Sequence, residues 1–326
     1  MITDSIPQIF HNCLTVKNID GEFFPLRFSD SLLAYYDSID KGTSIRAHSC
    51  AGITMDFFTT DDEFSFCYKT HAFCRPMMVF DFFEDGVFLG SIREPDESPS
   101  GTITYRKVKK GKVRITIYVP YCAQISFSSF RLSNFEPVPN SKIRFLFLGD
   151  SITQGMTVLH PSQSYPLLLS SLFQAAWINQ GVGGFVYDKN TLLDIPFLLP
   201  DHIFVAYGTN DYTRLKNGCI SKETFQIHVK EYMERLHHIS KQIPVTILTP
   251  LWRADCPLPQ DDPLFSYVTK EIEETGREEG FSILPGLSLV GHDNDFYADG
   301  LHPNDHGASM MALHILKQMN EENLSL

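Results

Sequence analysis

The sequence predicts two domains of different architecture: an N-terminal β-sandwich of jelly-roll type, and then a three-layer α/β/α domain with a parallel sheet. Residues 13–133 hold short, partly alternating apolar runs separated by turn residues, which is the pattern of antiparallel strands. From residue 143 onward, apolar runs of strand length alternate with segments of helical length, as in a parallel sheet covered by helices on both faces. We therefore expect a β-sandwich in residues 1–140 and an α/β/α domain in residues 141–326.

Turn signals divide the first domain into strands. The expected strands are residues 51–60, 64–68, 77–83, 87–92, 102–108, 112–119 and 124–132, with a short helix at 29–39. Glu84-Asp85-Gly86 and Lys109-Lys110-Gly111 each separate two such runs, so both are expected to close hairpins. Residues 134–141 are expected to form the linker. The many aromatic side chains are expected in the core, although exposed ones would suit carbohydrate binding.

In the second domain the strands and helices alternate along the chain. Strands are expected at residues 143–149, 176–179, 202–207, 244–249 and 281–284, and helices at 162–175, 221–242, 262–279 and 304–320. In such an arrangement the loops that follow the strands carry the chemistry, because they meet at one edge of the sheet.

Composition and charge exclude several classes of function. The net charge of −12 argues against nucleic acid or an anionic membrane as the main partner, because both require a basic surface. No apolar run is long enough to span a bilayer, and the first residues lack the pattern of a signal peptide. Seven scattered cysteines without a CxxC pair favour reduced thiols and a cytoplasmic location. No metal-ligand cluster is apparent, and no cofactor is implied.

A candidate nucleophile stands at the end of the first strand of the second domain. The apolar run 143–149 stops at Gly149-Asp150-Ser151, which is expected to turn into a helix. A serine at the carboxyl end of a central strand faces the crevice where α/β sheets bind ligands, and N–H groups at a helix start can stabilise an oxyanion. The alternative is that Ser151 only caps the helix.

Three later segments supply the other groups that acyl transfer requires. Residues 179–184 form a glycine-rich loop whose N–H groups can approach a ligand closely. Asn210 lies in the loop after another strand. Asp299 and His302, three residues apart, can hydrogen-bond, so that the carboxylate orients the imidazole and the ring takes the serine proton. His306 is a rival base, but we expect it inside the closing helix without a carboxylate at the right spacing.

These four segments, in this order and each after an expected strand, resemble the blocks of the SGNH hydrolase superfamily, also called GDSL hydrolases. The resemblance covers roughly residues 143 to 320. It implies a catalytic triad of Ser151, His302 and Asp299, and an oxyanion hole built from Ser151, Gly184 and Asn210. A strand-rich first domain is also similar to that of acetyl-esterases of carbohydrate esterase family two, and to a group of two-domain GDSL-like acylhydrolases.

The resemblance implies a serine esterase that removes an acyl group, acetyl above all, from a sugar or oligosaccharide. Trp252 and Arg253 follow a strand and are candidates for the substrate pocket, although a packed ring and a surface charge would explain them equally well. Two alternatives stay open. One is the same chemistry on a lysophospholipid or a thioester, and the other is a carbohydrate-binding protein without catalysis. The expected partner is a small-molecule or oligosaccharide ester, with no nucleic acid and no membrane, and homo-oligomerisation is left open.

Overall fold

The structure, a computed structural model, describes residues 5–139 and 141–321 and divides the chain into two compact units. One unit comprises Met1–Lys142 with His160–Ser162, and the other comprises Ile143–Leu159 with Gln163–Leu326. The boundary expected at residue 140 lies outside the described residues. No helix in the described part of the chain is both long and apolar enough to cross a membrane.

The first unit contains two antiparallel sheets. The first sheet has the order β1 (Phe10–His11), β4 (Thr54–Thr59), β9 (Val113–Tyr118), β6 (Val79–Glu84) and β7 (Val87–Arg93), with β11 (Phe135–Pro137) also paired to β4. The second has the order β2 (Thr15–Ile19), β3 (Glu22–Leu26), β10 (Ala123–Arg131), β5 (Glu63–Phe73) and β8 (Ser100–Arg106). Two facing antiparallel sheets confirm the predicted β-sandwich.

Aromatic side chains from both sheets fill the space between them. Phe66 of β5 contacts Phe80 of β6 with ring centroids 5.9 Å apart, and Phe66 also contacts Phe127 of β10. On β9 the inward residues Ile115 and Ile117 alternate with more exposed neighbours. Burying one such large apolar side chain stabilises the fold by about 1.5–3 kcal/mol, so the aromatic content of this half is explained by its core.

One predicted hairpin is wrong. β8 pairs with β5 in one sheet while β9 pairs with β4 and β6 in the other, so the turn at Lys109-Lys110-Gly111 crosses between sheets. Buried polar groups hold this crossing. The ammonium of Lys107 donates to the carbonyl oxygen of Gly111 over 2.6 Å, and Glu84 accepts from the N–H groups of Val108 and Lys109 over 2.7 and 2.8 Å. The hairpin at Glu84-Asp85-Gly86 is confirmed, because β6 pairs with β7.

Part of the predicted linker is also a strand, since β11 pairs with β4. The helices of this unit are η1 (Ile6–Ile9), α2 (Asp30–Ile39) and α3 (Lys41–His48). The expected short helix corresponds to α2, whose cap Ser29 accepts from the N–H of Leu32 over 3.2 Å. α3 was not expected, and it begins where Asp40 accepts from the N–H of Thr43 over 2.9 Å.

The second unit is built on a five-stranded parallel sheet. Its order is β13 (Ala176–Gly181), β12 (Arg144–Gly149), β14 (His202–Ala206), β15 (Val245–Leu248) and β16 (Ser282–Leu284). The chain starts on β12, steps out to β13 and returns to β14 on the other side. The strand order therefore reverses at β12, and the crevice at the carboxyl ends of such strands is where α/β proteins bind ligands.

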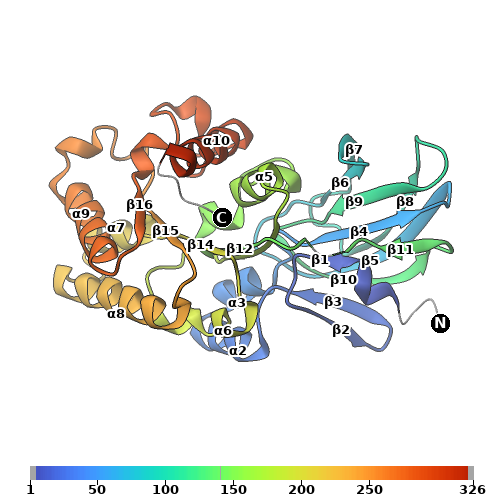
Figure 1. The fold of residues 1–326 in the computed structure, drawn as a ribbon, viewed down its shortest axis with the longest axis horizontal. Helices are drawn as coiled ribbons and strands as arrows, with labels where there is room; N and C mark the ends of the chain where they lie inside the picture. The colour runs from blue at the N-terminus through green and yellow to red at the C-terminus, as the bar shows by residue number, and fades with distance from the viewer. Residues whose placement is uncertain (1–4, 140, 322–326) are drawn as a thin grey trace. The chain divides into compact units, whose positions relative to one another are not determined.

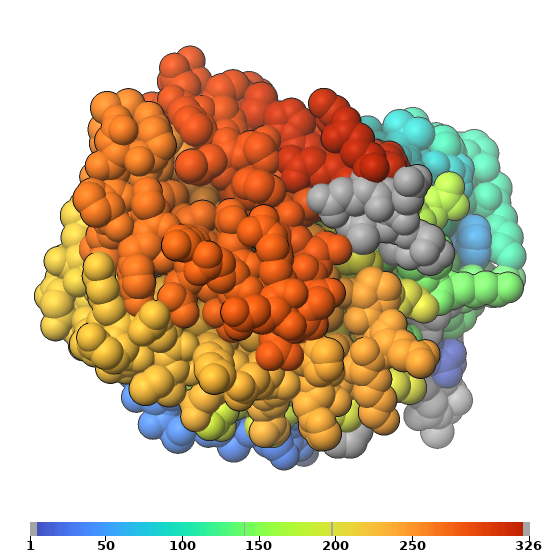
Figure 2. Space-filling view, turned by 60° about the vertical axis from the view of Figure 1, so that its left-hand side comes forward, coloured from blue at the N-terminus to red at the C-terminus, as the bar shows by residue number. Residues whose placement is uncertain are grey.

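Helices cover both faces of this sheet. They are α4 (Ser151–Gln154), α5 (Tyr165–Leu172), α6 (Ile195–Leu198), α7 (Thr209–Lys216), α8 (Lys222–Ser240), α9 (Pro263–Glu278) and α10 (Asp305–Glu321), with 3-10 turns η2 (Pro161–Gln163), η3 (Lys189–Leu192), η4 (Pro259–Asp261), η5 (Gly286–Ser288) and η6 (Asn294–Phe296). α5 and α10 pack together on one face, and α8 lies on the other (Figure 1). Figure 2 shows α8 in yellow beside the orange segment that contains α9. These layers confirm the predicted α/β/α domain.

Candidate active site

The turn after β12 presents Ser151 at the carboxyl edge of the sheet. Asp150 caps α4, its Oδ1 accepting from the N–H of Ile152 over 2.9 Å, and Ser151 is the first helical residue. A Cβ on Gly149 would lie 2.1 Å from Oγ1 of Thr153 and 2.8 Å from the carbonyl oxygen of Ala206. Only glycine therefore lets the turn lie this close to the sheet. Ser151 is 6% exposed, so its hydroxyl is largely shielded from water.

The loop before α10 brings an imidazole to this serine. Nε2 of His302 lies 2.7 Å from Oγ of Ser151, and its Nδ1 lies 2.9 Å from Oδ2 of Asp299. Asp299 also accepts from the backbone N–H of His302 over 2.9 Å, and Gly300 between them has a φ of 75°. Asn304 caps α10 through Gly307, which stops the loop. A hydroxyl, an imidazole and a carboxylate in a hydrogen-bonded row form the geometry of a nucleophile with an oriented base.

The charge on Asp299 suits this arrangement. Partial burial alone would raise the pKa of Asp299, but the hydrogen bonds from the backbone N–H and the ring of His302 outweigh it, and the net shift is downward. Asp299 therefore stays ionised at neutral pH. An ionised carboxylate at Nδ1 favours the tautomer that leaves Nε2 free to accept the serine proton.

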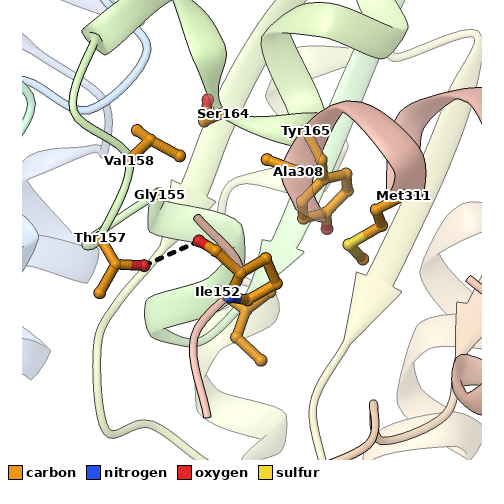
Figure 3. A pocket seen from close by; sticks show the side chains of 9 residues that line it. Ile152, Gly155, Thr157, Val158, Ser164, Tyr165, Ala308 and Met311 are labelled. Atoms are coloured by element: carbon orange, nitrogen blue, oxygen red, sulfur yellow. Dashed lines mark hydrogen bonds between the residues drawn. The ribbon is translucent and has the colours of Figure 1, made fainter. Parts of the chain in front are cut away.

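Two hydrogen bonds tie the segment after the nucleophile to the segment after the histidine. Thr157 Oγ1 donates to the carbonyl oxygen of Pro303 over 2.9 Å (Figure 3). The N–H of Leu159 donates to Asp305 over 2.7 Å. Ile152 and Thr157 line a cavity of about 10 Å³ behind the nucleophile turn, which is at the lower limit for one water molecule. The two catalytic segments are thus packed against each other with almost no free space.

Two backbone N–H groups in these segments have no acceptor in the part of the chain that the structure describes. Within the described residues, the N–H groups of Ser151 and Gly184 have no hydrogen-bond acceptor. Gly184 has a φ of 78°, which a glycine adopts readily. Asn210, on the first turn of α7, has its amide nitrogen 3.1 Å from Oδ2 of Asp150 and 3.0 Å from the carbonyl oxygen of Phe185. The two backbone groups are therefore free to donate, whereas the amide already has two acceptors.

Two carboxyl groups are buried beneath this site. Burial and the neighbouring charge of Asp211 raise the pKa of Asp150 to about 7, although the N–H of Ile152 acts in the opposite direction. Burial also raises the pKa of Asp211 to about 7, although backbone N–H groups and the charge of Arg214 lower it. Near neutral pH each of these two carboxyl groups is therefore protonated in part of the molecules. Burial disfavours the ionised form, and two carboxylates in one dry site would repel each other.

A known protein family matches the part of the chain that contains these segments. A family model described as the GDSL-like Lipase/Acylhydrolase family matches residues 147–310, which is half of the chain and spans the nucleophile turn, the glycine loop, α7 and the Asp299–His302 loop. The chain belongs to this family. The resemblance inferred from the four sequence segments is therefore confirmed.

Solved structures share the fold of this GDSL-like acylhydrolase over both units. The salicylyl-acyltransferase SsfX3 from a tetracycline biosynthetic pathway has a TM-score of 0.80 at 16% identity, covering 97% of this chain and 94% of its own. A GDSL-like lipase from Bacteroides ovatus has a TM-score of 0.70 at 16% identity, covering 88% and 89%.

A family two carbohydrate esterase from Clostridium thermocellum, solved with cellohexaose, has a TM-score of 0.62 at 16% identity, covering 84% of this chain and 93% of its own. At such identities the likeness is one of fold. A search by sequence among curated proteins finds no match.

The two residues considered for the substrate pocket are buried in this GDSL-like acylhydrolase. Trp252 is 5% exposed, packs on Tyr297, and donates from Nε1 to the carbonyl oxygen of Pro257 over 3.1 Å. Arg253 is also 5% exposed, and its guanidinium donates to the carbonyl oxygen of Thr209 over 3.0 Å and to Asp255. Both side chains hold loops at the carboxyl edge of the sheet. Contact with substrate stays a prediction for them.

His306 lies apart from the serine. It is exposed on the first turn of α10, whereas His302 is the imidazole that reaches Ser151. Among the described residues, no group of three or more His, Cys, Asp or Glu side chains is placed to hold a metal ion.

Two buried polar side chains that the sequence analysis did not single out shape the glycine loop. Gln154 accepts from the N–H of Gly183 over 2.8 Å. Asn179 accepts from the N–H of Gly181 over 2.9 Å and donates to the carbonyl oxygen of Thr153 over 2.8 Å. These bonds join the loop that carries Gly184 to the nucleophile turn. The sequence does indicate a structural role for Asn179, because a polar amide at the end of an apolar strand is buried and needs hydrogen-bond partners.

Proposed function

We propose that the protein is a serine esterase that forms an acyl-enzyme on Ser151 and removes a small acyl group, acetyl, from a sugar or oligosaccharide ester. The observation that carries the proposal is the hydrogen-bonded row from Ser151 through His302 to Asp299, with distances of 2.7 and 2.9 Å. Membership of the GDSL-like acylhydrolase family supports ester hydrolysis. The fold shared with the carbohydrate esterase of Clostridium thermocellum supports a sugar as the alcohol.

The roles follow from the positions of the protons. His302 takes the proton of Ser151 at Nε2 as Oγ attacks the ester carbonyl, and Asp299 stabilises the resulting imidazolium. The imidazolium then protonates the departing alkoxide, and the alcohol leaves. In the second half His302 takes a proton from water, the resulting hydroxide attacks the acyl-enzyme, and Ser151 recovers its proton as the carboxylic acid is released.

The negative oxygen of each tetrahedral intermediate requires donors. The N–H groups of Ser151 and Gly184 have no acceptor within the described residues, so they are ready to donate. Asn210 already bonds to Asp150 and to Phe185. Because an oxyanion accepts more strongly than a neutral carbonyl, we expect Asn210 to exchange the carbonyl of Phe185 for the oxyanion during reaction. Losing one such donor typically lowers the rate about 100- to 1000-fold.

The packing behind the nucleophile turn leaves little room there for an acyl chain. Two cavities adjoin the nucleophile turn, one lined by Thr157 and Pro303 and the other by Tyr207 and Leu248, and each has a volume of about 10 Å³. Neither can bury an alkyl chain. An acyl group attached to Ser151 would therefore have to remain short or extend away from these cavities.

Acyl transfer to an alcohol or amine other than water is a second candidate. The observation that favours it is the fold shared with the salicylyl-acyltransferase SsfX3 over 97% of this chain. The same acyl-enzyme would serve both outcomes, and only the second nucleophile would differ. If transfer competes with hydrolysis, added ethanol should yield the ethyl ester beside the free acid, and added hydroxylamine should yield the hydroxamate beside the free acid.

The direct test is Ser151→Ala with a nitrophenyl acetate substrate. A methyl group fits the turn, so the fold should persist while turnover falls to background. In the wild type, mass spectrometry of a quenched reaction should show an acetyl group on the peptide that contains Ser151, and the variant should not acquire it. Wild-type turnover by Ser151→Ala would exclude the proposal, because it would mean that another group is the nucleophile.

A further inference from the structure

A polar cavity lies outside the catalytic row. It has a volume of about 270 Å³, and its polar lining includes Lys189, Asn190, Arg214, His228 and Glu231. These residues come from η3 with the loop before it, from α7 and from α8. With roughly 30 Å³ for each water molecule, the cavity has room for about nine waters, enough for one polar ring but not for a long chain.

Several of the charges in this lining neutralise one another. Nζ of Lys189 lies 3.0 Å from Oε1 of Glu231. Asp188 also lines the cavity, and its Oδ1 accepts from both the backbone N–H and the side-chain amide of Asn190 over 2.9 Å. These groups are committed to one another, so a ligand would have to compete with them.

One donor in the lining is not committed. Arg214 is exposed, and no carboxylate in the described part of the chain lies within salt-bridge distance of it. His228 also lines the cavity, but its Nδ1 is buried and does not face the open space. The guanidinium of Arg214 therefore presents N–H groups to an acceptor in the cavity. The guanidinium fork matches the two oxygens of a carboxylate or a phosphate.

Residues that line the cavity are close in sequence to the residues of the expected oxyanion hole. Val186, which lines it, follows Gly184 by two residues. Arg214 stands four residues after Asn210 on α7, so the two lie on one helix face about one turn, or roughly 6 Å, apart along the axis. The charge of Arg214 is also felt by the buried carboxyl of Asp211, next to Asn210. A molecule in the cavity would thus lie within reach of an ester held at Ser151.

We propose that this cavity is a subsite for an anionic substituent, a carboxylate or a phosphate, carried by the alcohol part of the ester. The inference rests on the proposed esterase function and narrows its substrate to an acylated acidic sugar or sugar phosphate. Arg214 binds two oxygens of the anion. In a chain with a net charge of −12, an uncommitted guanidinium beside the site offsets the general repulsion of anions.

Three esters test the subsite: an acetylated methyl glucoside, an acetylated methyl glucuronoside and acetylated glucose 6-phosphate. The wild type should show a higher kcat/KM for at least one anionic ester than for the neutral one, by about tenfold, the scale of a charge-assisted contact. The two anionic arms separate a carboxylate site from a phosphate site. In Arg214→Gln the ratio of kcat/KM for the anionic ester to kcat/KM for the neutral ester should fall to near one. In Arg214→Glu the neutral ester should become the better substrate.

The matched control is Arg277→Gln. Arg277 is exposed on α9, which contributes no residue to the cavity lining, so the variant loses the same charge without changing the subsite. Its ratio of anionic to neutral kcat/KM should equal that of the wild type. Equal kcat/KM for all three esters in the wild type, or equal effects of the Arg214 and Arg277 changes, would overturn the inference.

Binding without turnover separates this inference from the proposed function. Calorimetry on Ser151→Ala should detect methyl glucuronoside or inorganic phosphate, and the double variant with Arg214→Gln should bind at least tenfold more weakly. If the wild type hydrolyses no ester while this Arg214-dependent binding is present, the esterase proposal fails and the anion site stands. If nitrophenyl acetate is hydrolysed but neither anion binds through Arg214, the anion site fails alone.

Discussion

The hydroxyl of Thr157 donates a hydrogen bond of 2.9 Å to the carbonyl oxygen of Pro303. Thr157 follows the nucleophile by six residues, and Pro303 follows His302 directly. The two catalytic segments are 151 residues apart in the chain, yet this bond joins them beside the 2.7 Å contact between Ser151 and His302. It acts on the position of the base relative to the nucleophile, and not on the substrate.

Thr157→Val should therefore slow the reaction without weakening substrate binding. Valine has nearly the same shape, so the packing stays while the hydrogen bond, worth about 0.5–1.5 kcal/mol, is lost. We expect kcat to fall about 3- to 10-fold with KM nearly unchanged. Thr104→Val is the matched control, because Thr104 is exposed on β8. A Thr157→Val enzyme with wild-type kcat would show that the bond does not position the base.

The buried carboxyl of Asp211 should make stability fall as pH rises. Unfolded, it ionises near its usual pKa of about 4, whereas burial raises the folded pKa to about 7. Between these values the folded protein keeps a proton that the unfolded chain releases. The contribution is therefore complete below about pH 4 and is lost as pH rises through about 7.

Asp211→Asn should remove most of this dependence, and also the charge that raises the pKa of Asp150. The expected result is a smaller fall in Tm between about pH 5 and about pH 8 than in the wild type. Asp295→Asn, at an exposed position, should keep the wild-type slope. Thermal melts of the three proteins across this range are the measurement, and parallel curves for Asp211→Asn and wild type would contradict the argument.

Most of the second unit follows from its sequence, because its strands are buried on both faces and are read as apolar runs. All five strands of the parallel sheet lie where such runs predict them. Short helices are less visible. α4 has four residues and α7 has eight, and each starts at a functional residue, Ser151 or Thr209 beside Asn210. Their beginnings depend on capping and tertiary contacts, which a local pattern of periodicity does not contain.

The sandwich shows a different limit. Local turn residues at Lys109-Lys110-Gly111 predict a hairpin, but strand pairing also depends on which sheet each apolar face joins. That choice is made by distant groups such as Glu84, which accepts from the turn 24 residues later. Likewise the sequence leaves Arg253 open between a pocket residue and a surface charge, and only the fold supplies the carbonyl and carboxylate partners of this buried side chain.

Acyl-chain length should separate an acetyl-esterase from a lipid-type acylhydrolase. The two cavities behind the nucleophile turn measure about 10 Å³ each and are not lined by Ser151, so neither can bury added methylenes. A buried CH₂ contributes about 0.8 kcal/mol, and without burial that gain is absent. We expect kcat/KM on nitrophenyl esters to fall at least about tenfold from acetyl to octanoyl. A preference for octanoyl would favour the lysophospholipase or thioesterase alternative.

The assignment of the general base makes the sharpest prediction for this site. His302 has the serine hydroxyl at Nε2 and the Asp299 carboxylate at Nδ1, whereas His306 lies exposed on the first turn of α10. A base in acyl transfer needs both a proton to accept and a partner that orients the ring. His302→Ala should therefore lose nearly all activity, and His306→Ala should keep most of it.

Asp299→Asn should fall between these two variants. It keeps the shape of the loop, but a neutral amide stabilises the imidazolium less and can hold the wrong tautomer of His302. The lowered pKa of Asp299 indicates that the ionised form is the one the loop stabilises, so the loss should persist at every pH where the wild type is active. Steady-state kinetics of the three variants on one acetyl ester is the measurement. An inactive His306→Ala beside an active His302→Ala would overturn the role of His302, and with it that of Asp299.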